Sequence, residues 1–125
     1  MVHTGSRVTV VDNSGALLVS CIRVLKESKK NAVAIGQSFV GSVKQNELKE
    51  KKRPILRGDI CKALVVLTKS PVSRLGNCYI SANVGAIVLI STDVMPVGNR
   101  ITSPIFVEIR CSKYSKIFAI ADLFV

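Results

Sequence analysis

Turn-forming residues interrupt this chain at short intervals, and their spacing limits what the chain can fold into. Gly, Pro, Asn and Asp mark turns at 13–15, 36, 54–58, 71, 76–77 and 98–99. Runs rich in Val, Ile and Leu lie between the turns at 7–11, 17–25, 38–44, 60–69 and 86–92. Short strands with regular turns predict a mainly β protein, either a small closed barrel or a sandwich.

The last part of the chain has a different pattern. Ser103 is suited to cap a helix that has Pro104 at its first position. Helical spacing is present at Tyr114, Ile117, Phe118 and Ala121. We expect one or two short helices packed on the barrel. A length of 125 residues indicates a single domain, 1–125, with the barrel in about 1–100 and the helical segment in about 101–125.

The stretch VVDNSGALL raises the question of catalysis, because it places Asp12 two residues before Ser14. A nucleophilic serine needs a base within hydrogen-bond reach, and the one histidine of the chain is His3, near its start. Asp, Asn, Ser and Gly are also the residues of a tight turn. We interpret the stretch as a hairpin connection and expect no enzyme. A small hydrolase using Asp12 and Ser14 is the alternative that Ser14→Ala tests.

A net charge of +10 indicates a polyanionic partner, with nucleic acid the first candidate and an anionic membrane the second. The uncharged segment 75–92 contains Asn, Ser and Gly residues that fit two short strands better than a membrane span.

The four cysteines are far apart in sequence, so we expect no metal site, no cofactor and reduced thiols. No secretory leader is expected, since Asp12 interrupts the first apolar run.

The basic residues cluster at expected loops and strand ends, where their side chains can reach phosphates. Six lie in 44–57 and four in 23–30. The aromatic residues stand mostly in apolar settings and are expected in the core: Phe39, Tyr79, Phe106, Tyr114, Phe118 and Phe124. A chain without exposed stacking platforms indicates recognition of folded RNA shape and backbone. A free barrel module that binds single-stranded nucleic acid is the alternative.

Seven blocks of the sequence carry a specific resemblance. They are VTVVDNSGA, CIRVLKES, AIGQSFVGSVK, LRGDICKALVVLTK, AIVLI, PVGNRI and KYSKIFAIA, in that order. Together they resemble the universal large-subunit ribosomal protein fourteen family, of bacterial and organellar type, from about Val8 to Leu123. The resemblance implies a five-stranded β-barrel with a projecting β-ribbon and a C-terminal segment with short helices. It also implies a structural role in the large ribosomal subunit.

The same resemblance implies partners and site residues. The partners are large-subunit rRNA, small-subunit rRNA across the interface, ribosomal proteins numbered three and nineteen, and the ribosome silencing factor. The rRNA contacts would be Lys26, Lys29, Lys30, Lys44, Lys49, Lys51, Lys52, Arg53, Arg57, Lys69 and Arg74. The face that forms intersubunit bridges and receives the silencing factor would include Asn99, Arg100 and Lys116.

The chain departs from the family pattern in charge. Leu17 and Leu18 stand where the family usually has arginine, and the ribbon sequence KSPVSRLGN is less basic than usual. A positive mean hydropathy of +0.38 is unusual for a ribosomal protein. With the absence of an expected targeting leader, it fits an organelle-encoded copy. We expect a mitochondrial ribosome, with a bacterial or plastid ribosome as the alternative.

Overall fold

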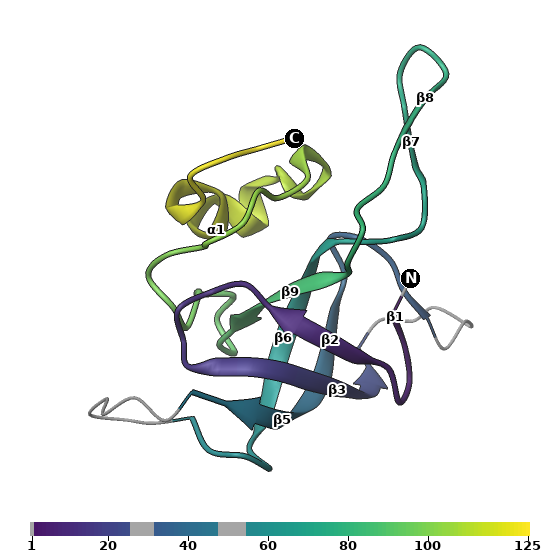
Figure 1. Ribbon diagram of the computed structural model, residues 1–125. Coiled ribbons are helices and arrows are strands. Elements are labelled where there is room, and N and C mark those ends of the chain that lie inside the picture. Colours follow the sequence, from purple (N-terminus) through teal and green to yellow (C-terminus); the bar gives the residue numbers. More distant parts are fainter. Residues whose placement is uncertain (1, 26–31, 48–54) are drawn as a thin grey trace.

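Five strands close into a barrel in the computed structural model, which describes residues 2–25, 32–47 and 55–125 (Figure 1). The barrel strands are β2 (Arg7–Val10), β3 (Ala16–Val24), β5 (Ser38–Asn46), β6 (Ile60–Leu67) and β9 (Ala86–Ile90). They pair in the order β2-β3-β5-β6-β9. The parallel β2–β9 pair closes the barrel, and every other pair in it is antiparallel. The predicted barrel is therefore confirmed, and the sandwich is excluded.

Two small two-stranded sheets flank the barrel. β1 (Val2–His3) pairs with β4 (Ala32–Val33). β7 (Val72–Arg74) pairs with β8 (Cys78–Ile80) to form a ribbon that projects away from the barrel in Figure 1. The ribbon reverses direction at Gly76 and Asn77, which both adopt positive φ, at 83° and 57°. Glycine and asparagine tolerate this conformation better than other residues, so the turn follows from the sequence.

The C-terminal segment contains one short α-helix and two 3-10 turns: η1 (Val107–Ile109), η2 (Ser112–Tyr114) and α1 (Ser115–Ile120). The predicted helix start at Ser103 and Pro104 is wrong. Ser103 lies in a bend and Pro104 lies outside any helix, and the next residue, Ile105, forms a parallel bridge with Phe124. The amide of Phe106 also donates to the carbonyl of Val66 on β6 at 3.3 Å. These contacts use the backbone groups that a helix would need.

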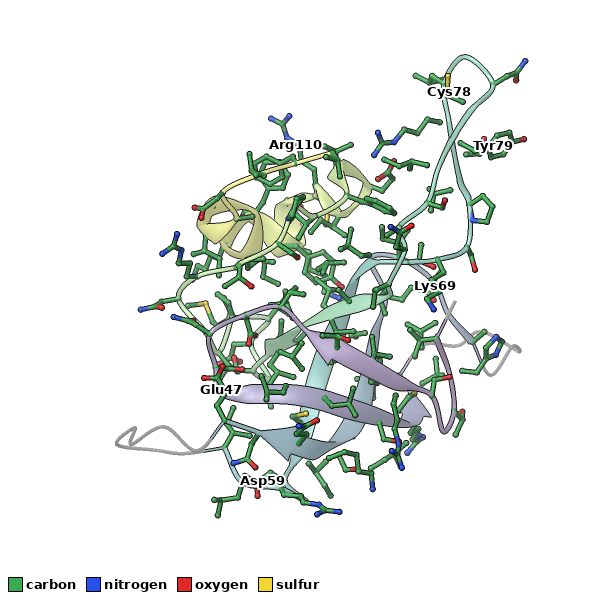
Figure 2. All side chains as sticks on the ribbon, viewed as in Figure 1. Glu47, Asp59, Lys69, Cys78, Tyr79 and Arg110 are labelled. Carbon is green, nitrogen blue, oxygen red and sulfur yellow. The ribbon has the colours of Figure 1, made fainter. Side chains whose placement is uncertain are left out.

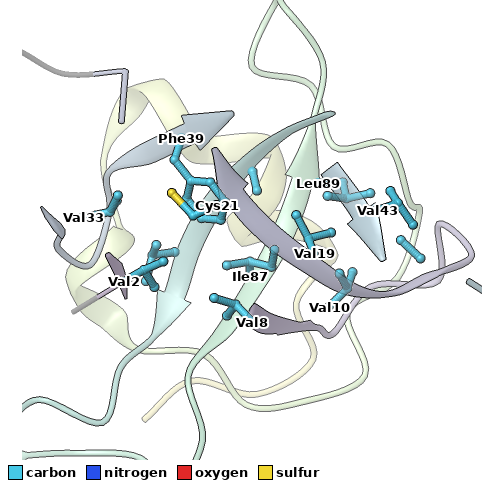
Figure 3. Close-up of a cluster of buried hydrophobic side chains, with 13 residues drawn as sticks. Val2, Val8, Val10, Val19, Cys21, Val33, Phe39, Val43, Ile87 and Leu89 are labelled. Atoms are coloured by element: carbon cyan, nitrogen blue, oxygen red, sulfur yellow. The ribbon is translucent and has the colours of Figure 1, made fainter. Parts of the chain in front are cut away.

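Two separate apolar clusters stabilise the fold. The first fills the barrel and includes Val19, Phe39 and Ile87 (Figure 3). The second lies between the outer faces of β6 and β9 and the C-terminal segment, where Ile117 is fully buried. β6 and β9 are thus covered on both faces, which explains why their sequences are continuous apolar runs instead of alternating ones.

Gly41 on β5 shows how tightly the barrel is packed. A Cβ atom at this position would lie 2.5 Å from Cγ1 of Val19 and 2.7 Å from the carbonyl oxygen of Ser20. Both neighbours belong to β3, which pairs with β5 at this point. Only a residue without a side chain allows the two strands to approach this closely.

The aromatic residues are less uniformly buried than the sequence predicts. Phe39, Phe106 and Tyr114 are in the core as expected. Tyr79 is 71% exposed and lies on the ribbon, pointing to solvent in Figure 2. Phe118 and Phe124 stack on each other at a centroid distance of 3.9 Å on the surface of the C-terminal segment, and Phe124 is 37% exposed. The prediction of an aromatic core is therefore wrong for Tyr79 and only partly right for this pair.

Candidate nucleic-acid interface

The hairpin connection at 11–15 is anchored by a buried carboxylate. Asp12 is 9% exposed. Its Oδ1 accepts hydrogen bonds from the amide of Ser14 at 3.0 Å and from the Ser14 hydroxyl, and its Oδ2 accepts from the amide of Leu89 at 2.9 Å. The carboxylate therefore fixes the shape of the connection and also joins it to β9. The sequence predicts the turn but not this second contact.

Asn13 joins the same connection to the loop at 98–102. Its Oδ1 accepts from the amides of Asn99 at 2.9 Å and Arg100 at 3.2 Å, and its Nδ2 donates to Oδ1 of Asn99. The amide of Thr102 donates to the carbonyl of Val11 at 2.8 Å. A Cβ at Gly98 would lie 2.6 Å from Oδ1 of Asn13, so the loop can approach only because residue 98 is glycine.

A hydrolytic site at Ser14 has no support in this geometry. The Ser14 hydroxyl is bonded to Asp12, whereas His3 lies before the first residue of β2 and Ser14 lies beyond its last. The two ends of β2 are three residue steps apart, about 10 Å at the usual rise, and His3 and Ser14 lie beyond opposite ends. A base at that distance cannot take the serine proton.

Three of the four predicted rRNA contacts that the structure describes lie at two ends of the barrel, and the fourth, Arg74, lies on the ribbon. Lys44 and Arg57 are exposed at the end where β5 finishes and β6 begins. Lys69 is exposed at the opposite end, at the base of the ribbon (Figure 2). The other predicted contacts lie outside the described residues: Lys26, Lys29, Lys30, Lys49, Lys51, Lys52 and Arg53. The predicted residues therefore do not form one site.

The two ends differ in charge among the described residues. Glu47 and Asp59 lie at the same end as Lys44 and Arg57, as Figure 2 shows for the two acids. Asp59 is partly engaged, since its Oδ2 accepts from the amide of Leu56 at 2.9 Å. The carboxylates at this end offset the charge of the two cations. The end with Lys69 is the more strongly basic of the two in the described part of the chain.

Arg74 makes contacts within the protein. Its guanidinium pairs with Glu108 through two nitrogens, and Nη2 donates to the carbonyl of Val125 at 2.6 Å. The hydrogen bond from Arg74 holds the pKa of Glu108 below its usual range. The guanidinium also lies 6.0 Å from the centre of the Phe106 ring. Arg74 thus connects the base of the ribbon to the C-terminal segment, and its role in rRNA binding stays a prediction.

The structure brings the predicted intersubunit residues to one region. Asn99 and Arg100 lie in the loop joined to Asn13, and the next residue, Ile101, forms a parallel bridge with Ala121 just after α1. The Arg100 side chain is 70% exposed and pairs with Asp122 at 3.5 Å. Lys116 on α1 places its Nζ 2.9 Å from the sulfur of Met95. The region is therefore a surface with mixed basic and apolar character.

Two clefts are lined by cations that are not among the predicted site residues, namely Arg7, Lys62 and Lys113. Arg7 and Lys69 line a cleft of about 240 Å³ between β2 and the end of β6. Lys62 and Lys113 line another of about 300 Å³ between the barrel and η2. Arg7 is the first residue of β2, a strand-end position that the reasoning on basic clusters missed because it considered only runs of charged residues.

The cysteines and the acidic residues form no metal centre in the described part of the chain. No group of three or more His, Cys, Asp or Glu side chains there is close enough to hold an ion, and all four cysteines are free. Desolvation raises the pKa of the Cys61 thiol to about 11, and the charges of Asp12 and Asp59 add to this effect. A thiol with this pKa is protonated at neutral pH and a poor nucleophile.

Within the described residues, no helix has both the length and the apolar character that a membrane crossing requires.

A closed five-stranded barrel with a projecting ribbon and a net charge of +10 defines the class of small basic β-barrel proteins. The model of the family described as "Ribosomal protein L14p/L23e" matches residues 1–125. The chain belongs to this ribosomal protein family, as its seven sequence blocks predict. The family consists of structural ribosomal proteins, so the prediction that the chain is not an enzyme is confirmed.

Two relatives are similar to the chain over most of its length. A protein of Acanthamoeba castellanii is 34% identical over 127 residues, covering 98% of both chains. A protein of Acanthamoeba polyphaga is 34% identical over 113 residues, covering 88% of this chain and 97% of the relative. Each is named large ribosomal subunit protein uL14m, the mitochondrial form. The family and these names support the predicted localisation in a mitochondrial ribosome.

The Asp12 contacts predict a specific loss of stability. Asp12→Asn replaces one acceptor oxygen by an amide that faces a backbone donor, so a buried N–H loses its partner. We expect the free energy of unfolding to fall by about 1–3 kcal/mol, measured by chemical denaturation. Asp93→Asn is the control, because Asp93 is exposed. Equal stability of the two variants would contradict the role assigned to Asp12.

The Arg74–Glu108 pair predicts a dependence of stability on pH. Because the pKa of Glu108 is lowered in the folded state, its contribution is present at neutral pH and lost as the pH falls through the acidic range. We expect Glu108→Gln to lower Tm by a few degrees at pH 7, and the difference from the unmodified protein to shrink below about pH 4. The measurement is thermal unfolding at several pH values.

The control for this prediction is Glu108→Gln in an Arg74→Gln background. Once the guanidinium is absent, the second substitution should add little further loss at pH 7. An undiminished effect in that background would show that Glu108 acts through other contacts.

Proposed function

We propose that this protein is a structural component of the large subunit of a mitochondrial ribosome, where it binds rRNA through cations at the two ends of its barrel. The observation that carries the proposal is the arrangement of Lys44 and Arg57 at one end and Lys69 at the other. Lys44 lies on β5, while Arg57 lies in the turn just before β6 and Lys69 follows the end of β6. The packed core of the barrel therefore sets the spacing of these three positions before RNA is bound. Phosphate contacts of this kind set the position of a protein on RNA and release counterions.

The surface at Asn99, Arg100 and Lys116 is proposed to face the small subunit. There it would contact small-subunit rRNA in an intersubunit bridge or receive the ribosome silencing factor. The exposure of Arg100 and the neighbouring exposed side chains of Met95 and Val97 support a contact surface. The ribbon and the remaining faces are proposed to pack beside ribosomal proteins numbered three and nineteen.

A free single-strand-binding barrel is the weaker candidate. Such modules use several exposed aromatic side chains as stacking platforms. Of the six aromatic residues, Tyr79 is the one exposed by more than half, and it lies at the ribbon and not on the barrel. A single platform at the ribbon does not form a track for successive bases.

Sucrose-gradient sedimentation of mitochondrial and cytosolic extracts, probed for this chain, tests the proposal. We expect the protein to migrate with the large subunit of the mitochondrial fraction after a moderate-salt wash. Migration as a slow peak in both extracts would mean a free RNA-binding barrel, and the ribosomal function would have to be abandoned.

The two proposed surfaces predict different effects of charge reversal. Arg100→Glu should weaken subunit joining or silencing-factor binding while the protein stays on the large subunit, because the Arg100 side chain is 70% exposed and pairs with Asp122 of the C-terminal segment. Arg57→Glu, the matched variant, should instead reduce retention of the protein on the large subunit. The measurements are the ratio of joined to free subunits and the amount of this chain per large subunit. Loss of the Arg100→Glu protein from large subunits with joining unchanged would refute the assignment.

A further inference from the structure

A cleft opens at one end of the barrel because two neighbouring strands begin at different levels. β9 begins at Ala86, opposite Thr9 on β2 and Leu67 on β6. Arg7 and Val8 come earlier in β2 and pair with β3 but have no partner on β9. The space left between the start of β2 and the end of β6 is the cleft of about 240 Å³. It has room for about eight waters, enough for a phosphate group with some of its hydration.

The lining of this cleft suits an anion. Arg7 enters from β2 and Lys69 from the chain just after β6, so the two cations stand on opposite walls. Three residues with hydroxyl groups, Ser6, Thr9 and Thr68, also line it, and the Thr68 hydroxyl accepts from the amide of Ser70 at 3.1 Å. None of the described residues that form the lining carries a carboxylate. The Ser6 hydroxyl accepts from the amide of His3 at 3.2 Å, and its own proton can still be donated.

We propose that this cleft binds a phosphate of the RNA backbone between Arg7 and Lys69, as a specific binding site at the end of the barrel that carries Lys69. The inference rests on the proposed rRNA-binding function and adds to it one residue, Arg7, that the family resemblance does not assign. The guanidinium of Arg7 offers two parallel donors to the phosphate oxygens, and the Lys69 ammonium adds a point charge from the other wall.

Gly85 forms part of the lining and gives a way to fill the cleft without changing its charge. A Cβ at this position would lie 3.8 Å from the carbonyl oxygen of Leu67 and 3.9 Å from Cγ1 of Val8, both ordinary contact distances. Gly85 is absent from the residues with positive φ in the described chain. Alanine should therefore be accepted here without strain, while a longer side chain extends from between the two walls into the cleft.

The first test measures RNA binding by the full-length protein as a function of salt. The probe is a fluorescent A-form RNA duplex of about 20 base pairs. Between about 50 and about 200 mM salt, the unmodified protein should show a steep linear dependence of log affinity on log salt. Arg7→Ala should lower affinity about fivefold and reduce the slope by about 0.9, the value for one lost phosphate contact. Lys69→Ala should behave in the same way.

The matched control is Arg23→Ala, which removes the same charge from an exposed position on β3, outside the cleft lining. We expect it to change affinity less than twofold. Equal losses for Arg7→Ala and Arg23→Ala would overturn the proposal, because binding would then depend on net charge and not on this cleft.

The second test uses the two substitutions at Gly85. Gly85→Gln should lower RNA affinity with net charge unchanged, and Gly85→Ala should leave it near that of the unmodified protein. Thermal unfolding of both variants checks that the barrel is intact. If Gly85→Gln folds and binds the duplex with full affinity, the cleft is not the seat of a phosphate.

Competition by inorganic phosphate tests whether the duplex occupies the cleft through a phosphate group. At matched ionic strength, phosphate should displace the duplex more strongly than chloride does, and Arg7→Ala should reduce this difference. A phosphate-specific displacement that is unchanged in Arg7→Ala would mean that the two ligands compete elsewhere, and it would overturn the assignment of the cleft. Failure of the unmodified protein to bind the duplex would count against the proposed function as well, whereas normal binding with insensitive variants would reject the cleft alone.

Discussion

The fold depends on one buried carboxylate where the barrel closes. Asp12 contacts its own turn through Ser14 and the neighbouring strand through Leu89, so it holds β2 and β9 together at the end of their short parallel pair. The adjacent Asn13 then holds the loop at 98–102, and Ile101 in that loop forms a bridge with Ala121. A chain of contacts therefore runs from the barrel closure to the proposed intersubunit surface. The position of Arg100 is therefore set by Asp12 and Asn13, two residues that are far from it in the sequence.

A second connection fixes the ribbon and limits what its charge can do. Arg74 is the basic residue within β7, and its guanidinium bonds to Glu108 and to the carbonyl of Val125. These contacts orient the ribbon against the C-terminal segment and use donors that would otherwise be available to phosphates. The ribbon beyond Arg74 carries exposed Leu75 and Tyr79. Its surface is therefore more apolar than that of the barrel ends, where the proposed RNA contacts lie.

The sequence predicts the barrel strands well because the turns between them are strongly marked, and each observed barrel strand starts and ends within a few residues of its apolar run. It fails at Ser103 and Pro104, where tertiary pairing of Ile105 with Phe124 overrides a local capping signal. The predicted burial of Tyr79 also fails, because the sequence does not show that the ribbon projects away from the packed core. The Arg7 cleft is invisible in sequence, since it arises from the different starting levels of β2 and β9.

The length of the barrel then determines how the protein can act on RNA. β6 has eight residues and runs from the end with Lys44 and Arg57 to the end with Lys69, a span of about 25 Å at the usual rise per residue. A span of this size is several times the distance between neighbouring phosphates along one strand. In the proposed function, cations at the two ends would contact separate segments of a folded RNA. Because the core between them is closely packed, the protein would then fix the distance between those segments, and a small barrel would contribute to a large ribonucleoprotein in this way.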